Sequence, residues 1–339
     1  MLPLHSSQPG SRPDHPGSRL TDPGAQATVR SRPGRQPYFF SPMPAEFAID
    51  KRRVRRNFAR AAAAYDAAAV LSREVCSRML ERLDLVRLTP EHILDTGSGT
   101  GLVARALAQR YPRAHITQVD FSRPMLSVEH RAGSWLDTLR GALGQGARAA
   151  VCADFERLPI RTAAIDLVVS NLALHWTSTP EAALAEGHRV LRRGGLLMFS
   201  TLGPDSLKEL AQVSADAQGR SPVHRFIDMH DLGDLLVNSG FADPVMDMEY
   251  LTLTYPRVED LFRDLRGSGS LSARAGEAGL RTPRWRERLV QRYERLRRDG
   301  SLPATFEVVY GHAWKPEQGP RVTADGSAVI RFDRPRRKA

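Results

Sequence analysis

Strands and helices alternate along most of this chain, as the spacing of its apolar residues indicates. Short apolar runs predict strands, and apolar residues three and four positions apart predict helices. We expect strands within 92–99, 115–122, 147–155, 165–174 and 196–203, and helices over 102–111, 124–136 and 180–191. Single helices between strands are typical of a doubly wound, mostly parallel sheet that is covered on both faces. The pattern therefore predicts an α/β fold.

Helical spacing also precedes this alternating region and returns after it. From about residue 45, an apolar stripe that includes Phe58, Ala62, Tyr65 and Ala69 predicts an N-terminal helical segment. Beyond 203 we expect a helix at 228–240 and strands at 245–254 and 304–314, which brings the sheet to seven strands. The Arg-rich stretch 257–299 is too long for a hairpin turn. It is interpreted as a helical insertion before the last strand.

The two ends of the chain lack this periodicity. Residues 1–42 are rich in Pro, Ser, Gly and Arg, so we expect a disordered tail over 1–44, with Met43 as a second candidate start. A transit peptide is the alternative, but Asp14, Asp22 and several prolines oppose it. The folded domain is expected over 45–314, and a C-terminal tail over 315–339.

Composition narrows the function classes. No stretch of the 339 residues approaches the roughly 18 apolar residues of a membrane span, so an integral membrane protein is excluded. Two cysteines exclude a disulfide scaffold and suit a reducing compartment, and we expect a cytoplasmic protein. The net charge of +11 favours an acidic partner, although an arginine excess is also typical of GC-rich genomes.

Charge is concentrated in residues 281–298, which hold eight arginines and two glutamates. Three interpretations remain open for this stretch. It is a solvated helix face, a docking surface for an acidic protein, or a nucleic-acid surface in which Trp285 and Tyr293 interleave the arginines.

A glycine-rich loop follows the first predicted strand and opens a helix. It reads Asp95-Thr-Gly97-Ser-Gly99-Thr-Gly101. Glycines let the backbone turn sharply and approach a ligand closely. The spacing matches neither the dinucleotide-binding fingerprint nor a phosphate loop. A turn without a ligand is the alternative.

Polar residues end the next three strands at the same edge of the sheet. Asp120 ends the second strand, where a carboxylate accepts the hydroxyls of a ribose or caps the helix that begins near Pro124. Asp154 ends the third strand and is suited to an adenine amine, with the Phe155 ring against the base. Asn171 ends the fourth. Ligands of open α/β sheets bind at this edge, so we expect these residues to share one crevice.

With these residues, the sequence resembles the class I S-adenosylmethionine-dependent methyltransferases over about 50–255. The resemblance implies a class I methyltransferase fold with S-adenosyl-L-methionine as cofactor. It implies that the loop residues hold the methionine part and that Asp120 holds the ribose. Met125, Asp154 and Phe155 would surround the adenine. Asn171 would lie near the methionine end. The implied cofactor residues are Asp95, Gly97, Gly99, Gly101, Asp120, Phe121, Met125, Asp154, Phe155 and Asn171.

A narrower resemblance covers about 58–314. The segments FARAAAAYDAAAVLSREV, SNLALHW, STLGPDSLKEL and LPATFEVVYGHAW are similar to the malonyl-acyl-carrier-protein O-methyltransferase family of biotin synthesis. The resemblance implies methyl transfer to the malonyl carboxylate of an acyl-carrier protein. Ser72 departs from the pattern, which would have Gln there. Two alternatives remain: a related assembly factor that hydroxylates a protein arginine, and a nucleic-acid methyltransferase. SNLALHW lacks the Asn/Asp-Pro-Pro-aromatic motif of the latter, so a nucleic-acid partner is not expected.

The chemistry of such a transfer sets what the site needs. A malonyl carboxylate is ionised at neutral pH, so it attacks without a general base but requires a polar or cationic clamp. Candidates are Tyr65, His175, Arg263 and Arg266, each of which is also explained by packing or by a solvated surface. Carrier contacts are expected at Arg263, Arg266, Arg288 and Arg292. The histidines lack zinc-site spacing, so we expect no metal.

Overall fold

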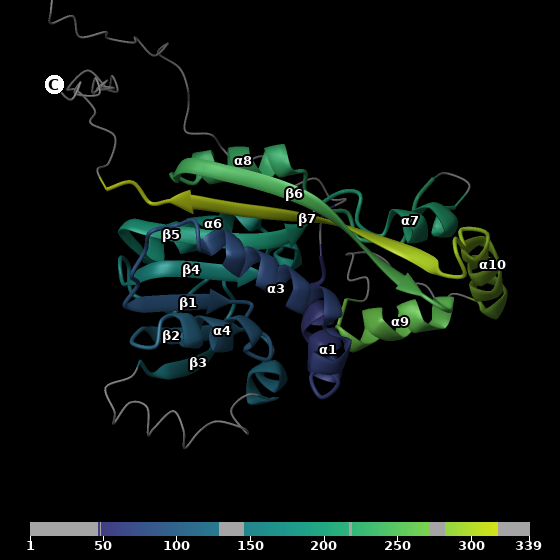
Figure 1. The fold of residues 1–339 in the computed structure, drawn as a ribbon, viewed down its shortest axis with the longest axis horizontal. Coiled ribbons are helices and arrows are strands. Elements are labelled where there is room, and N and C mark those ends of the chain that lie inside the picture. Colours follow the sequence, from purple (N-terminus) through teal and green to yellow (C-terminus); the bar gives the residue numbers. More distant parts are fainter. Residues whose placement is uncertain (1–46, 48, 129–145, 217–218, 271–281, 318–339) are drawn as a thin grey trace, which may run out of the picture. The chain divides into compact units, whose positions relative to one another are not determined.

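A computed structural model describes residues 47, 49–128, 146–216, 219–270 and 282–317. The described residues form a seven-stranded sheet in the order β3-β2-β1-β4-β5-β7-β6 (Figure 1). Its strands are β1 His92–Thr96, β2 His115–Asp120, β3 Arg148–Cys152, β4 Ile165–Asn171, β5 Leu191–Leu202, β6 Ala242–Tyr255 and β7 Leu302–Trp314. Strands β1 to β5 pair in parallel, and β7 runs antiparallel to both β5 and β6. The predicted fold class is confirmed.

Helices cover both faces of this sheet (Figure 1). They are α1 Lys51–Ala61, α2 Tyr65–Ala68, α3 Val70–Leu83, α4 Leu102–Arg110, α6 Pro180–Val190, α7 Lys208–Ser214, α8 Met229–Asn238, α9 Val258–Gly267 and α10 Pro283–Glu294, with a 3-10 turn, η2, at Leu174–Trp176. Alternate residues of β5 enter opposite cores. Met198 packs with α3 and α4, whereas Phe199 packs with α6 and α8. Burial on both faces explains the continuous apolar strands.

The N-terminal helical segment is broken where alanine propensity alone would continue it. A turn separates α1 from α2, and Ala69, at φ −80° and ψ 41°, separates α2 from α3. The Asp66 carboxylate accepts a hydrogen bond from Thr100 Oγ1 at 2.5 Å, which ties this turn to the glycine loop. Tertiary contacts therefore outweigh the high helix propensity of the alanines.

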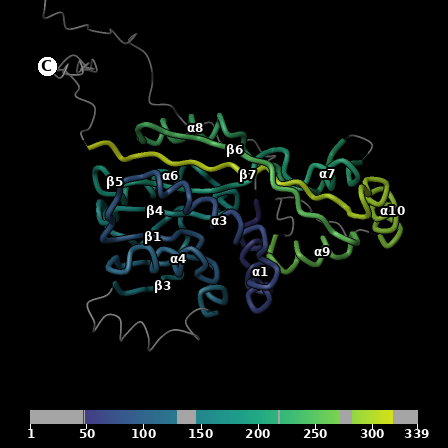
Figure 2. The backbone as a smooth tube through the Cα atoms, in the orientation of Figure 1, coloured from purple at the N-terminus to yellow at the C-terminus, as the bar shows by residue number. Residues whose placement is uncertain are grey.

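The last two strands extend past the rest of the sheet. β5 pairs only with residues 308–314 of β7 among the described residues, whereas β6 pairs along its whole length. The overhanging ends of β6 and β7 carry α7, α9 and α10 (Figures 1 and 2). Both α9 and α10 lie in the predicted insertion. β5 starts at Leu191 rather than 196, with its pairing register shifted between Leu191 and Leu196.

Several expectations fall on residues outside the described ranges. These are the N-terminal tail over 1–44, residues 129–136 of the helix predicted at 124–136, and residues 318–339 of the C-terminal tail. Within the described part of the chain, no helix is long and apolar enough to cross a membrane.

Candidate functional site

A cavity of about 510 Å³ opens at the carboxyl ends of the parallel strands. It brings together the ends of β2 and β4 with the loops that follow β1 and β3, as the sequence predicted. The predicted site residues that line it are Tyr65, Gly97, Gly99, Asp120, Phe121, Met125, Asp154, Phe155, Asn171, His175 and Arg266. Those that lie outside its lining are Asp95, Gly101, Arg263, Arg288 and Arg292.

The glycine loop is drawn tightly against the sheet. The backbone N–H groups of Gly97 and Ser98 both donate to the carbonyl of Val119, at 2.8 and 3.1 Å. Gly97 has a φ of +67°, and a Cβ there would collide with the Cβ of Ala173. Asp95 is buried behind the loop, where it accepts a hydrogen bond from Ser98 Oγ at 2.7 Å. Asp95 therefore shapes the loop from the side away from the cavity.

Asp120 is the buried acid that ends β2 and lines the cavity. Its two carboxylate oxygens accept one backbone hydrogen bond each, from Gly99 at 3.0 Å and from Ser122 at 2.7 Å. Burial raises the pKa of Asp120 to about 6, and these two bonds partly oppose the rise. A carboxylate oxygen has two lone pairs, so both oxygens keep the capacity to accept a second donor.

Asp154 is held by a residue that the sequence did not single out. Lys51, at the start of α1, forms an ion pair with Asp154 and a second with Glu156 Oε2 at 2.8 Å. Glu156 Oε1 in turn accepts from the backbone N–H groups of Ser178 and Thr179, at 2.5 and 3.1 Å. One lysine thus links α1 to the loop after β3 and to the start of α6.

Asn171 joins the N-terminal helices to the sheet. Its Nδ2 donates to the carbonyl of Ser72 on α3 at 3.1 Å, and its Oδ1 accepts from Ser200 Oγ on β5 at 2.8 Å. Ser72 also contacts the Tyr65 hydroxyl through its Oγ at 3.3 Å. Burial raises the pKa of Tyr65 above its ordinary value, so its phenol stays protonated and can donate.

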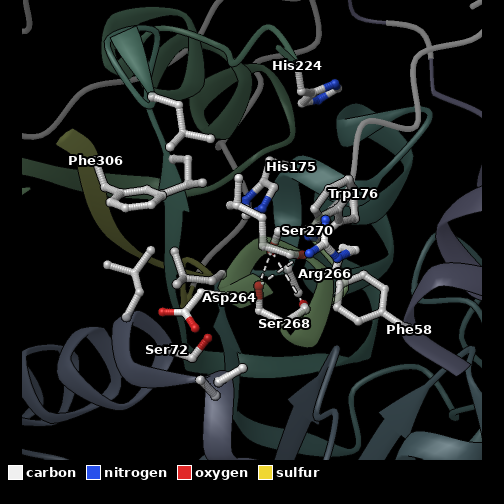
Figure 3. Close-up of a pocket in the computed structure, with 18 of the residues that line it drawn as sticks. Phe58, Ser72, His175, Trp176, His224, Asp264, Arg266, Ser268, Ser270 and Phe306 are labelled. Carbon is white, nitrogen blue, oxygen red and sulfur yellow. Dashed lines mark hydrogen bonds between the residues drawn. The ribbon is translucent and has the colours of Figure 1, made fainter. Parts of the chain in front are cut away.

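His175 lies at the other end of the cavity, among aromatic rings. Figure 3 shows it between Trp176 and Phe306, and its ring lies 5.0 Å from that of Trp176 and 5.5 Å from that of Phe226. Burial lowers the pKa of His175 to about 3, with a smaller contribution from His224. The imidazole is therefore neutral at pH 7, and its Nδ1 contacts Thr201 Oγ1 at 3.3 Å.

The two arginines that were candidates for the carboxylate clamp differ in position. Arg266 reaches into the cavity from α9, near Trp176 and Phe58 (Figure 3), and has no ion pair with any described residue. Arg263 is on the surface, where it donates to Asp260 Oδ1 at 2.6 Å. Among the described residues that line the cavity, Arg266 and Arg286 are the exposed ones, so they mark its mouth.

An apolar wall that the sequence did not predict completes the cavity. It comes from β5, α7, β6, α10 and β7, which the overhanging ribbon brings together. Its members include Leu202, Leu207, Leu210, Leu253, Leu289 and Phe306. The sequence did not mark these residues, because their shared chamber depends on how the insertion folds back.

The structure of α10 does not fit the interpretation of its sequence as a nucleic-acid surface. Tyr293 is buried and donates its hydroxyl to the carbonyl of Pro303 at 2.8 Å, and Trp285 lines the cavity. The arginines Arg288 and Arg292 are exposed. Aromatic rings are therefore not interleaved with arginines on the surface, as base stacking would require. No cluster of potential metal ligands occurs in the residues that the structure describes.

This strand order, with a glycine loop after β1 and an acid at the end of β2, defines a class I methyltransferase. Residues 94–199 match the family model described as a methyltransferase domain. A candidate methyltransferase from Bacillus halodurans C-125 has the same fold, with a TM-score of 0.50 and 19% identity over 71% of this chain and 99% of that one.

Named enzymes have a higher sequence identity to this chain. The malonyl-[acyl-carrier protein] O-methyltransferase of Gallionella capsiferriformans is 52% identical over 84% of this chain and 97% of its own length. The enzyme of the same name from Laribacter hongkongensis is 52% identical over 86% and 98%. The chain belongs to the malonyl-[acyl-carrier protein] O-methyltransferase family, and it is a methyltransferase.

Proposed function

We propose that this chain transfers a methyl group from S-adenosyl-L-methionine to the free carboxylate of malonyl-acyl-carrier protein, the step that masks this carboxylate for biotin synthesis. The observation that carries the proposal is the extent of the similarity. It covers 287 residues, well beyond the methyltransferase domain at 94–199, and so includes the elements that build the acceptor end of the cavity.

The residues at the cofactor end fit S-adenosyl-L-methionine. Asp120 would accept the ribose hydroxyls with its remaining lone pairs. Gly97 and Gly99 lack side chains that would fill the space for the methionine part, and Asn171 lies beside them. Met125, Phe121 and Phe155 would flank the adenine, with Asp154 at its amine. When bound, the cofactor supplies a methyl group on a positively charged sulfur.

At the acceptor end, this chain has to position a carboxylate and keep water away. Arg266 supplies the positive charge, because the neighbouring His175 is neutral. Tyr65 and His175 line the same cavity and would orient the carboxylate as neutral hydrogen-bonding groups. The apolar wall excludes water from the reacting oxygen. A malonyl carboxylate is already ionised, so no residue has to remove a proton.

The acidic carrier protein would contact the exposed arginines outside the cavity. Arg263 on α9 and Arg288 and Arg292 on α10 are exposed, and α9 packs against α10. Arg266 and Arg286 lie at the mouth between these helices. The arrangement would let a carrier on this side deliver its malonyl thioester into the cavity.

The test is methyl transfer with labelled S-adenosyl-L-methionine and malonyl-carrier protein. We expect label in the carrier protein as a base-labile methyl ester. Acetyl-carrier protein, which has no free carboxylate, is the matched control and should stay unlabelled. Failure to label malonyl-carrier protein, or label that resists base, would contradict the proposed function.

A further inference from the structure

The outer face of α1 carries a stripe of arginines. Positions 52, 55, 56 and 60 are three or four residues apart and share one face of the helix. We call Arg52, Arg55, Arg56 and Arg60 the α1 stripe; all four are exposed. Their side chains make no ion pair or hydrogen bond with the described residues. The stripe is therefore free to meet a partner.

The α1 stripe opposes the stability of the helix that carries it. Arg52, Arg56 and Arg60 follow one another at four-residue spacing, and like charges at this spacing repel. Asp50 caps the first turn by accepting from the Arg53 N–H at 3.1 Å, so the repulsion between the arginines is the effect that remains. An anionic partner would relieve it. Local conflicts of this kind are expected at functional surfaces.

The inner face of α1 places the stripe beside the cavity. Val54 and Ala61 are buried, and Lys51 and Phe58 line the cavity. A Cβ on Gly269, just after α9, would lie 2.7 Å from Phe58 Cδ1, so α1 and the end of α9 are in close contact (Figure 1). A partner on the stripe would thus sit next to Arg266 at the mouth.

The two helices α1 and α10 differ in the positive charge that each offers to an acidic partner. Within its helical bounds, α1 has six basic residues and no acidic one, whereas α10 has four arginines and two glutamates. Within these bounds the net charges are +6 and +2, and the three arginines that follow α10 raise the second value to +5. Several arginines of that stretch are bonded, because Arg292 donates to the carbonyl of Val213 and Arg297 pairs with Glu294. The arginines of the α1 stripe, unbonded among the described residues, are therefore the better placed for long-range attraction of an acidic protein.

We propose that the α1 stripe is the principal docking surface for an acidic helical face of the carrier protein, an inference that rests on the proposed function. The observations disfavour other polyanions. Phe58 packs edge-on against Trp176, at 5.6 Å between ring centroids, so α1 offers no exposed aromatic ring to stack on nucleic-acid bases. Its apolar face is buried in the protein rather than available to a membrane.

The test compares two charge reversals of equal size and spacing. One variant carries Arg52→Glu, Arg56→Glu and Arg60→Glu, and its control carries Arg284→Glu, Arg288→Glu and Arg292→Glu on α10. Each is assayed with malonyl-carrier protein and with malonyl-pantetheine, which lacks the protein. We expect the α1 variant to raise KM for malonyl-carrier protein about tenfold and the α10 variant to raise it less. KM for malonyl-pantetheine should stay unchanged.

Thermal unfolding checks that the α1 variant folds, and titration of the carrier protein measures its binding without catalysis. Unchanged carrier affinity in the α1 variant, or a larger loss in the α10 variant, would overturn the proposal. If the α1 variant lost binding to RNA but kept its affinity for the carrier protein, the occupant of the α1 stripe would be a nucleic acid rather than the carrier. If the wild-type protein methylates neither thioester, the proposed function fails, and the carrier titration still decides the docking surface.

Discussion

At the scale of single residues, the proposed contact between Asp120 and the ribose should make S-adenosyl-L-methionine binding sensitive to pH. Burial raises its pKa to about 6, so it is ionised at pH 7.5 and becomes protonated as the pH falls through 6. Ribose hydroxyls donate to the ionised form, so binding favours deprotonation, and affinity must fall with acid. We expect S-adenosylhomocysteine to bind about tenfold more weakly at pH 5 than at pH 7.5, as measured by calorimetry.

The Asp120→Asn variant provides the control for this assignment. Its amide does not titrate, so its affinity should be lower at pH 7.5 and should lose this pH dependence. Equal affinities of the wild-type protein at the two pH values would remove Asp120 from the proposed ribose site.

Two of the predicted site residues contact other residues of the glycine loop rather than the cavity. Asp95 and Gly101 belong to the predicted cofactor motif but lie outside the cavity lining. Gly101 is the N-cap of α4, with a φ of +80°, and Asp95 accepts from Ser98. The motif therefore mixes residues that face the cavity with residues that hold the loop in shape. The sequence could not separate the two kinds, because both kinds stand at regular spacing in one loop.

At the scale of elements, the position of α1 depends on Lys51. Its ion pairs with Asp154 and Glu156 are partly exposed, so each contributes modestly. We expect Lys51→Met to weaken S-adenosylhomocysteine binding about fivefold, because Asp154 and α1 lose their tie beside the proposed position of the adenine. Arg110→Met is the matched control, since Arg110 pairs with Asp84 away from the cavity. Calorimetry that gives equal affinities for the two variants would contradict this role for Lys51.

The elements of the parallel sheet were predictable, because short apolar runs alternate with apolar residues at helical spacing, although β2 also contains Thr117 and Gln118. The strand ends placed Asp120, Asp154 and Asn171 in one crevice without any tertiary information. Apolar periodicity predicted neither α7 nor the turn between α1 and α2. That turn depends on the bond between Thr100 and Asp66, which are 34 positions apart, and apolar periodicity does not record such contacts.

Long-range contacts also explain why the sequence did not predict two residues of the site, Lys51 and Arg286. Lys51 meets Asp154 across 103 positions of sequence, and no local pattern marks it. Arg286 is one of several arginines in its stretch, and only the fold shows that it faces the cavity while Arg288 does not. Predictions from the sequence were therefore strongest for backbone motifs and weakest for long side chains.

At the scale of the whole molecule, the cavity joins parts of the chain that are far apart in sequence. Its lining runs from Lys51 on α1 to Phe306 on β7 and includes all the parallel strand ends named above. A ligand in the cavity contacts the parallel sheet, the N-terminal helices and the insertion together. Because these elements share one cavity, ligand binding should stabilise them as a unit.

Thermal unfolding measures this coupling directly. A ligand at 100 times its Kd stabilises the native state by about 2.7 kcal/mol. For a chain of this size, S-adenosylhomocysteine should therefore raise Tm by roughly 4–5 °C. Arg266→Gln, at the acceptor end, should keep the full shift, whereas Asp120→Ala should lose most of it at the same ligand concentration. If both variants lost the shift equally, the two ends of the cavity would not be the separate cofactor and acceptor sites proposed for this chain.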